Sequence, residues 1–263
     1  MGKSEKVKKG SLVNVGLGMT LGAHITPISR SYIENADVVF VAASNNIVEQ
    51  WVKTMNKDVR SLQQYYHEGT SRMVTYKKMV EVMLCEVRQG KQVCGAFYGH
   101  PGVFSWPPHD SIKQARKEGF KAHMEPGISA EDCLFADLGL DPGRHGCINL
   151  EASQYMFRNK KIDPTSYVIL WQVAVAGDRT LSKFSTESSY RQVLVDLLLE
   201  TYTKDSEIIL YECAVLPIDQ PLIKTIMLKK LVHANISLKT TVVIPPINVT
   251  VLNLDVVKRI ENL

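Results

Sequence analysis

The segment QVCGAFYGHPGVF (92–104) joins a continuous apolar run to a loop rich in glycine and proline. An apolar run bounded by turn residues is typical of a strand buried on both faces of a parallel sheet. We expect this strand over 92–99, after which Pro101 and Gly102 impose an irregular backbone. Such a loop leaves main-chain amides and carbonyls facing a crevice, where they can hold a small polar ligand. The alternative is a plain connector.

Outward from this segment, strand-like and helix-like stretches alternate through the first half of the chain. In 71–89 apolar residues recur at helical spacing and stop before Gly90, which predicts a helix. This alternation with short loops predicts a mostly parallel sheet covered on both faces. The other expected elements are strands at 12–15, 38–42, 59–62 and 121–125, a helix capped by Thr26 with Pro27 first, and a helix over 109–118.

The pattern continues with less regularity beyond the loop PGIS (126–129). A domain boundary is expected near 125–130, where ligands of open α/β sheets often bind. It divides the chain into a basic disordered arm (1–10), a first α/β domain (11–126) and a second (127–263). The elements expected in the second half are helices over 128–140 and 187–202, strands over 166–177, 207–215 and 238–246, and a short final helix.

Composition excludes several classes of function. The formal net charge is +4, but residues 1–10 hold four lysines and one glutamate, so the rest is close to neutral and argues against a nucleic-acid partner. No apolar run reaches the roughly 18 residues of a membrane span, so no membrane partner is expected. The five cysteines form no CxxC pair and the histidines no HExxH spacing. These patterns indicate a cytoplasmic protein without a metal.

The glycines of VGLGMTLGAH (15–24) resemble a dinucleotide-binding fingerprint. A dinucleotide site requires an acid at the end of the second strand, and VVFVAAS (38–44) offers none there. The phosphate-binding pattern GxxxxGK[ST] is also absent from the sequence. A tight strand-to-helix turn remains as the simpler interpretation.

The stretch QQYYHEGTSRMVTY (63–76) gathers three tyrosines and an arginine. Arg72 and Tyr76 are four residues apart, so on a helix they share a face. Tyr66 precedes that helix and Tyr98 ends the adjacent strand, so all four side chains can meet at one crevice. The alternative is ordinary packing of tyrosine rings at a helix start.

Several motifs, in this order, resemble the tetrapyrrole-methylase superfamily of two-domain α/β enzymes that use S-adenosylmethionine. They are VGLG (15–18), ENADVVF (34–40), YGHPGVF (98–104) and EPGISAE (125–131). A narrower set resembles the borosin peptide N-methyltransferases, and the likeness extends from residue 11 to the late 240s. That set is QQYY…SRMVTY (63–76), YGHPGVF, LEASQ (150–154), LWQ (170–172) and TTVVIPP (240–246).

The resemblance implies a fold and a function. The fold is two α/β domains with a mostly parallel sheet in the first, a mixed sheet in the second and the active site in the cleft between them. The function is iterative α-N-methylation of backbone amides in a ribosomally made precursor peptide, by a homodimer. No apolar core peptide follows VVKRIENL (256–263), so we expect the bacterial split form, which acts on a separate precursor.

The resemblance also implies which residues act. An amide nitrogen is a poor nucleophile because its lone pair is delocalised into the carbonyl, so the site needs a base near nitrogen and donors at oxygen. Arginine suits the donor role, and tyrosine either donates or, as phenolate, takes the proton, a form that a neighbouring Arg72 would favour. The catalytic residues implied are Tyr66, Arg72, Tyr76 and Tyr98. Those implied for S-adenosylmethionine, and for its product S-adenosylhomocysteine, are Tyr98, His100, Val103, Ala130, Gln172, Cys213, Thr240 and Thr241.

Two other functions stay open at this stage. One is C-methylation of a tetrapyrrole or other small molecule on the same fold. The other is a non-catalytic peptide-binding module that retains a methylase fold. The Tyr-Arg-Tyr cluster and the long helix over 71–89 favour a peptide substrate.

Overall fold

The structure is a computed structural model that describes residues 10–248 and 250–263. The expected basic arm therefore lies, but for Gly10, outside the described residues. The chain divides into two compact units. Unit 1 contains the residues up to Gly139, Asp178–Phe184 and Cys213–Leu222, and unit 2 contains the remainder. The linear division at residue 126 stays a prediction, and it differs from these units because unit 1 includes two later segments of the chain.

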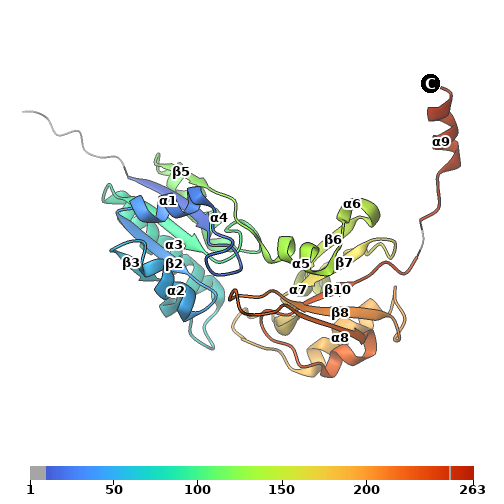
Figure 1. Ribbon diagram of the computed structural model, residues 1–263. Coiled ribbons are helices and arrows are strands. Elements are labelled where there is room, and N and C mark those ends of the chain that lie inside the picture. Colours follow the sequence, from blue (N-terminus) through green and yellow to red (C-terminus); the bar gives the residue numbers. More distant parts are fainter. Residues whose placement is uncertain (1–9, 249) are drawn as a thin grey trace, which may run out of the picture. The chain divides into compact units, whose positions relative to one another are not determined.

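Unit 1 is built on a five-stranded sheet whose paired strands are parallel (Figure 1). The strand order is β3-β2-β4-β1-β5, so the strand of the opening segment, β4, lies in the centre beside β1 and β2. The strands are β1 (Ser11–Gly16), β2 (Val38–Ala42), β3 (Val59–Ser61), β4 (Gln92–Phe97) and β5 (Lys121–Met124).

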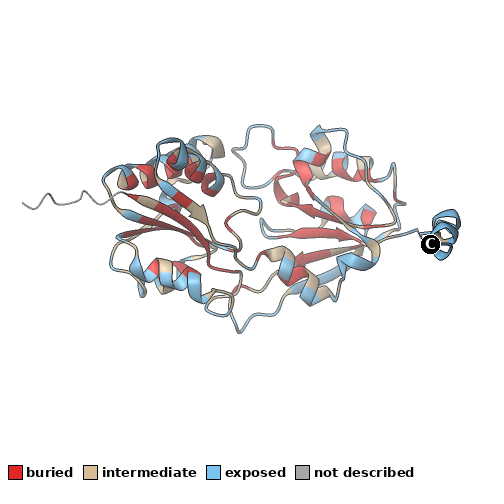
Figure 2. Cartoon of the chain, turned by 90° about the horizontal axis from the view of Figure 1, so that it is seen from above, coloured by how far each residue is buried: buried red, intermediate tan, exposed pale blue. Residues whose placement is uncertain are grey.

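Helices cover both faces of this sheet because successive strand residues point to opposite sides. Leu12 and Phe40 belong to the core formed with α3 and α4, whereas Val13 and Val41 belong to the core formed with α1 and α2. Figure 2 shows the central strands as buried between these helices. The helices are α1 (Pro27–Asn35), α2 (Asn46–Lys53), α3 (Arg72–Arg88), α4 (Trp106–Lys117) and α5 (Ala130–Leu138), with a 3-10 turn η1 (Gln63–Tyr65).

Unit 2 contains a mixed five-stranded sheet in the order β6-β7-β10-β8-β9. β6 and β7 are parallel, whereas β10 runs antiparallel to both β7 and β8. The strands are β6 (Cys147–Glu151), β7 (Tyr167–Trp171), β8 (Glu207–Glu212), β9 (Leu222–Met227) and β10 (Thr241–Ile244). The helical segments are α6 (Pro142–His145), α7 (Ala152–Phe157), η2 (Val173–Val175), α8 (Ser188–Leu198), η3 (Leu228–His233) and α9 (Leu254–Glu261).

The expected α/β class, with a parallel first sheet and a mixed second one, is confirmed. Thr26 caps α1 by accepting from the Ser29 amide, and Pro27 is the first helical residue, as expected. The expected start of α4 at residue 109 is wrong. The helix begins at Trp106, because Pro107 and Pro108 fit its first turn, where no backbone donor is needed.

The long strand expected over 166–177 is also wrong. β7 ends at Trp171, because Gln172 adopts a left-handed backbone (φ 58°) and a 3-10 turn follows. The elements α2, β6 and β9 were not predicted by the sequence pattern. None of the helices among the described residues combines the length and the apolar character needed to cross a membrane.

Three backbone segments meet closely where the strands of unit 1 end. A Cβ atom added to Gly16, the last residue of β1, would lie 2.5 Å from the Gly99 carbonyl oxygen and 2.7 Å from the Gly127 Cα. A Cβ on Gly127 would meet the same carbonyl at 2.5 Å. Leu17 and Gly18 continue the backbone pairing, since Gly18 bonds with Gly99 in both directions. Only glycine fits at Gly16 and Gly127 without moving backbone.

We predict that Gly16→Ala destabilises the protein by about 1–3 kcal/mol, because backbone atoms rather than a flexible side chain must give way. At roughly 2–4 °C per kcal/mol, the melting temperature measured by circular dichroism falls by several degrees. The matched control is Gly143→Ala in α6, where the nearest atom is the Asp141 side-chain oxygen at 3.1 Å. Equal melting temperatures for the two variants would contradict this account.

Candidate active site

The carboxyl ends of the strands of unit 1 carry the residues expected to be catalytic. Parallel strands end at one edge of the sheet, so the loops that follow them lie close together. Tyr66 follows β3 through the turn η1, and Tyr98 directly follows β4. The Tyr98 amide donates to the carbonyl of Ala42, which ends β2.

An aromatic cluster forms where α3 and α4 begin. The rings of Tyr66 and Tyr76 lie edge to face with centroids 6.3 Å apart. The ring of Trp106, the first residue of α4, stacks on Tyr76 at 6.2 Å with an interplanar angle of 17°. The buried Thr75 fixes the approach of the two segments, because its hydroxyl donates to the Tyr65 carbonyl. Sequence analysis placed Trp106 in a loop and so missed its place beside Tyr76.

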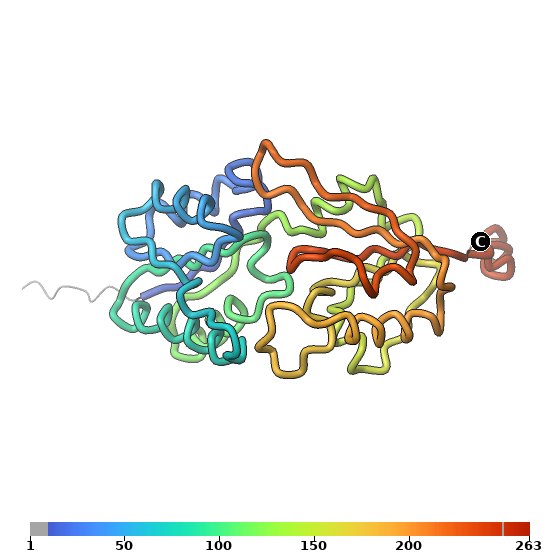
Figure 3. The backbone as a smooth tube through the Cα atoms, turned by 90° about the horizontal axis from the view of Figure 1, so that it is seen from below, coloured from blue at the N-terminus to red at the C-terminus, as the bar shows by residue number. Residues whose placement is uncertain are grey.

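Arg72 is the first residue of α3 and is held by the segment Asp178–Phe184 of unit 1. Its backbone amide donates to the Leu181 carbonyl at 2.7 Å, and its Nε donates to the same oxygen at 3.3 Å. Its Nη2 lies 3.7 Å from the Asp178 carboxylate. Figure 3 shows this later segment beside the start of α3.

The tyrosine hydroxyls influence one another. Burial is the largest cause of a strongly raised pKa of Tyr66, followed by the proximity of Tyr76 and Tyr98. Arg72 lowers the pKa of Tyr66, but its effect is smaller than all of these. Burial raises the pKa of Tyr98 most and Tyr76 raises it further, although 53% of the surface of the residue is exposed. The four expected catalytic residues therefore lie within electrostatic reach of each other in unit 1.

The loop after β4 is braced by two imidazoles. His100 Nδ1 accepts from the Gly102 amide at 2.8 Å, and His109 Nε2 lies 2.9 Å from the Gly102 carbonyl. His100 therefore shapes the loop with one nitrogen and keeps Nε2 as a donor. Val103 follows within the loop, and Phe104 then adopts a left-handed backbone (φ 48°). Non-glycine residues in this region cost about 1–3 kcal/mol and cluster at ligand sites.

Two more expected cofactor residues lie in unit 1. Ala130 is the first residue of α5, behind a capping box made by Ser129 and Asp132. Cys213 opens the segment Cys213–Leu222, which Figure 3 shows beside the loop after β1. The hydroxyl of Thr20, in the loop after β1, donates to the carbonyl of Ala214, the residue that follows Cys213.

The remaining three expected cofactor residues lie in unit 2, at one edge of the mixed sheet. Gln172 follows β7 with its left-handed backbone, and Thr241 begins β10. Thr240 is level with Gln172 when the β7–β10 register is extended. The Thr240 hydroxyl donates to Glu212 and accepts from the Ser237 amide, so it shapes a turn. Glu212, which also accepts from the Ser237 hydroxyl, was missed by sequence analysis.

Comparison with known proteins places this geometry in a family. The family model described as tetrapyrrole (corrin/porphyrin) methylases matches residues 11–225. Among solved structures, a cobalt precorrin-4 methyltransferase superposes with a TM-score of 0.64 at 17% identity, covering 93% of this chain and 98% of that one. At that identity the likeness concerns the fold alone.

More similar sequences come from fungi. A methyltransferase/ribosomally synthesised cyclic peptide gymnopeptides precursor from Gymnopus fusipes is 42% identical, over 99% of this chain and 63% of the relative. The corresponding omphalotin A precursor from Omphalotus olearius is 38% identical, over 99% of this chain and 64% of the relative. This chain thus spans less than two thirds of the length of these relatives. Because they are fungal and are named as both enzyme and precursor, the expected bacterial split form is not confirmed.

The match over residues 11–225 covers the whole first sheet and, in the second, the strands from β6 to the start of β9 but not β10. It includes all the expected catalytic residues and most of those expected to bind the cofactor. The chain belongs to the tetrapyrrole (corrin/porphyrin) methylase family.

Proposed function

We propose that this protein transfers methyl groups from S-adenosylmethionine to backbone amide nitrogens of a peptide, as a peptide N-methyltransferase of borosin type. The observation that carries the proposal is the grouping of Tyr66, Tyr76, Tyr98 and Arg72 in unit 1. The relatives named as methyltransferases and cyclic peptide precursors support a peptide substrate.

The residues expected to hold S-adenosylmethionine fit such a ligand. Phe104 and Gln172 have left-handed backbones within or beside the expected cofactor loops, as is common where main chain serves a ligand. The residues expected to bind it are His100, Val103 and Ala130 in unit 1, and Gln172 and Thr241 in unit 2. When bound, the cofactor supplies an electrophilic methyl carbon on a sulfonium.

In the proposed reaction, the residues of the protein make the amide nitrogen of the peptide nucleophilic. Transfer of the N–H proton to a base would place negative charge on the peptide carbonyl oxygen and leave the nitrogen able to accept the methyl group that the cofactor would supply. Arg72 is a permanent cation with several N–H donors and stabilises this oxygen. Holding the amide in line with the methyl group contributes up to roughly 7–11 kcal/mol of the barrier.

The raised pKa values of Tyr66 and Tyr98 favour the protonated form of each phenol. Both phenols stay protonated near neutral pH, so they donate hydrogen bonds to the developing oxyanion. Arg72 lowers the pKa of Tyr66 and so favours its phenolate, as expected, but burial and the two other tyrosines outweigh this effect. Tyr66 and Tyr98 are therefore donors rather than bases.

The proposed activity is tested by mass spectrometry of peptides after incubation with S-adenosylmethionine. An apolar peptide is offered both as a separate chain and fused after Leu263, and a tetrapyrrole is offered in parallel. The proposal expects mass increments of one CH2 on the peptide, located on backbone nitrogens by fragmentation. Increments on the tetrapyrrole alone would establish the small-molecule function instead. Failure to bind S-adenosylmethionine in calorimetry would indicate a non-catalytic module.

We predict that Arg72→Ala lowers kcat by about 10²–10³, the loss typical of one oxyanion donor, with cofactor affinity nearly unchanged. Tyr76→Phe also loses most turnover, because it removes a hydroxyl from the cluster without removing the ring. The matched control is Tyr32→Phe on α1, whose ring lies against His123. Initial rates from mass spectrometry, with calorimetry of the cofactor, measure both quantities. Wild-type rates in both variants would refute these roles.

The protonation of Tyr66 gives a second prediction. An ordinary tyrosine ionises near pH 10, whereas the raised pKa of Tyr66 keeps it neutral there. The tyrosinate absorbance of the wild type minus that of Tyr66→Phe should therefore stay flat as pH rises through about 10. In guanidinium chloride the same difference should rise near pH 10, because the unfolded chain no longer buries the phenol. A rise at or below pH 10 in the folded protein contradicts the donor assignment.

We further propose that the protein is a homodimer. α9 carries exposed apolar side chains at Leu254, Val256 and Ile260, and none of its residues is buried within the chain. Such an amphipathic helix gains stability by packing against a partner. Light scattering should give twice the 29.5 kDa of one chain, and Val256→Asp with Ile260→Asp should weaken the association. A monomer at micromolar concentration would count against it.

A further inference from the structure

The segment Asp178–Phe184 belongs to unit 1, although the residues on either side of it belong to unit 2. It meets the start of α3 through main chain. The Arg72 amide donates to the Leu181 carbonyl at 2.7 Å, and the Gly69 amide donates to the Ser182 carbonyl at 3.4 Å. The segment therefore fixes the end of the helix from which the guanidinium of Arg72 projects.

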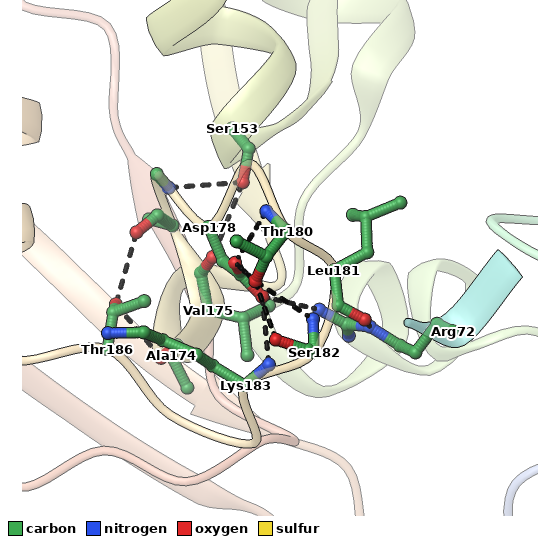
Figure 4. A network of polar contacts seen from close by, with 12 residues as sticks. Arg72, Ser153, Ala174, Val175, Asp178, Thr180, Leu181, Ser182, Lys183 and Thr186 are labelled. Atoms are coloured by element: carbon green, nitrogen blue, oxygen red, sulfur yellow. Dashed lines mark hydrogen bonds and ion pairs between the residues drawn. The ribbon is translucent and has the colours of Figure 1, made fainter. Parts of the chain in front are cut away.

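At the centre of this segment lies a buried carboxylate. The side chain of Asp178 is only 2% exposed. Its Oδ1 accepts from the Thr180 amide at 2.9 Å and from the Thr180 hydroxyl at 2.6 Å, and its Oδ2 accepts from the Lys183 amide at 3.0 Å (Figure 4). Burial raises the pKa of Asp178, but these hydrogen bonds outweigh it and the net pKa is lowered. A buried aspartate held in this way stays charged at neutral pH.

Arg72 meets this segment at two points, as Figure 4 shows. Nε donates to the Leu181 carbonyl, and Nη2 faces the Asp178 Oδ2 at 3.7 Å. Because the guanidinium is planar, two anchors on one side set its plane. The Nη1 donors make no hydrogen bond to any of the described residues. They remain available to a substrate oxygen.

We propose that Asp178 is a positioning residue for the methyl transfer: its carboxylate orients the Arg72 guanidinium so that the outer N–H donors are presented to the peptide carbonyl. The inference rests on the proposed function. It assigns a task to a residue 106 positions from Arg72 that no sequence motif singled out. Asp178 itself touches neither substrate nor cofactor in this scheme.

The main test is Asp178→Asn, alone and in the Arg72→Ala background. The amide keeps the size of the side chain and an oxygen toward Thr180, but it removes the charge that faces Arg72. We expect kcat on the methylated peptide to fall roughly 10- to 100-fold, the cost of a misplaced catalytic group, with cofactor affinity unchanged. Since Asp178 acts through Arg72, the double variant should be no slower than Arg72→Ala.

Two control variants distinguish the effect of losing the Asp178 charge from the effect of disrupting the turn that Asp178 forms with Thr180. Asp163 accepts from the Thr165 amide and hydroxyl in the same Asp-x-Thr arrangement, but it lies on the surface. Asp163→Asn should therefore change kcat by less than about twofold. Thr180→Val removes a hydroxyl hydrogen bond from Asp178 and leaves its charge, so it should retain most of the rate even if it lowers the melting temperature.

A readout independent of turnover keeps the inference testable if the proposed function fails. In NMR spectra of protein labelled at arginine nitrogen, restricted rotation should give Arg72 separate Nη1 and Nη2 signals. These should merge in Asp178→Asn. Merged signals in the wild type, or a rate loss in Asp178→Asn that multiplies with that of Arg72→Ala, would overturn the inference. Absence of methylation of every peptide, with the signals behaving as expected, would reject the function and retain the anchoring.

Discussion

The arrangement of the loops in unit 1 depends on how closely backbone segments approach one another at the carboxyl ends of its parallel strands. The Gly99 carbonyl oxygen lies only 2.5 Å from the position that a Cβ atom of either Gly16 or Gly127 would take. This contact draws together the loops that follow β1, β4 and β5, and the amides and carbonyls of Gly18 and Gly99 pair with one another there. A parallel sheet delivers its loops to one edge in any case. The glycines allow these loops to approach at main-chain distance.

The aromatic cluster lies at that edge, and two different parts of unit 1 hold its residues in place. From the sheet side, Tyr66 and Tyr98 are carried by the ends of β3 and β4. From the far side, the segment Asp178–Phe184 holds Arg72 through the Leu181 carbonyl and the Asp178 carboxylate. Burial is the largest cause of the raised pKa values of Tyr66 and Tyr98, which favour their neutral forms. A group of neutral and cationic donors suits a developing oxyanion, which is the charge that the proposed reaction places on the peptide carbonyl.

Local patterns in the sequence were enough for most of the fold and for part of the site. Helical spacing put Arg72 and Tyr76 on one face, and the parallel sheet placed Tyr98 near them. The two prolines after Trp106 suggested a loop, although they fit the first turn of α4. The stacking of Trp106 on Tyr76 was therefore not predicted. Gln172 ended β7 by its backbone conformation, which residue type does not reveal. Asp178 could not be found, because its contact with Arg72 joins distant parts of the chain.

The composition of unit 1 from three separate stretches of chain bears on how the protein is made. As the polypeptide leaves the ribosome, the residues up to Gly139 emerge first, and domains usually fold as soon as they are complete. Here the segment Asp178–Phe184, which holds Arg72, is synthesised after the first stretch of unit 2, and the segment Cys213–Leu222 after the second. Until then Arg72, at the start of α3, lacks its contacts with Asp178 and Leu181. A contiguous fragment ending at Gly139 would retain the tyrosines and lack the tether.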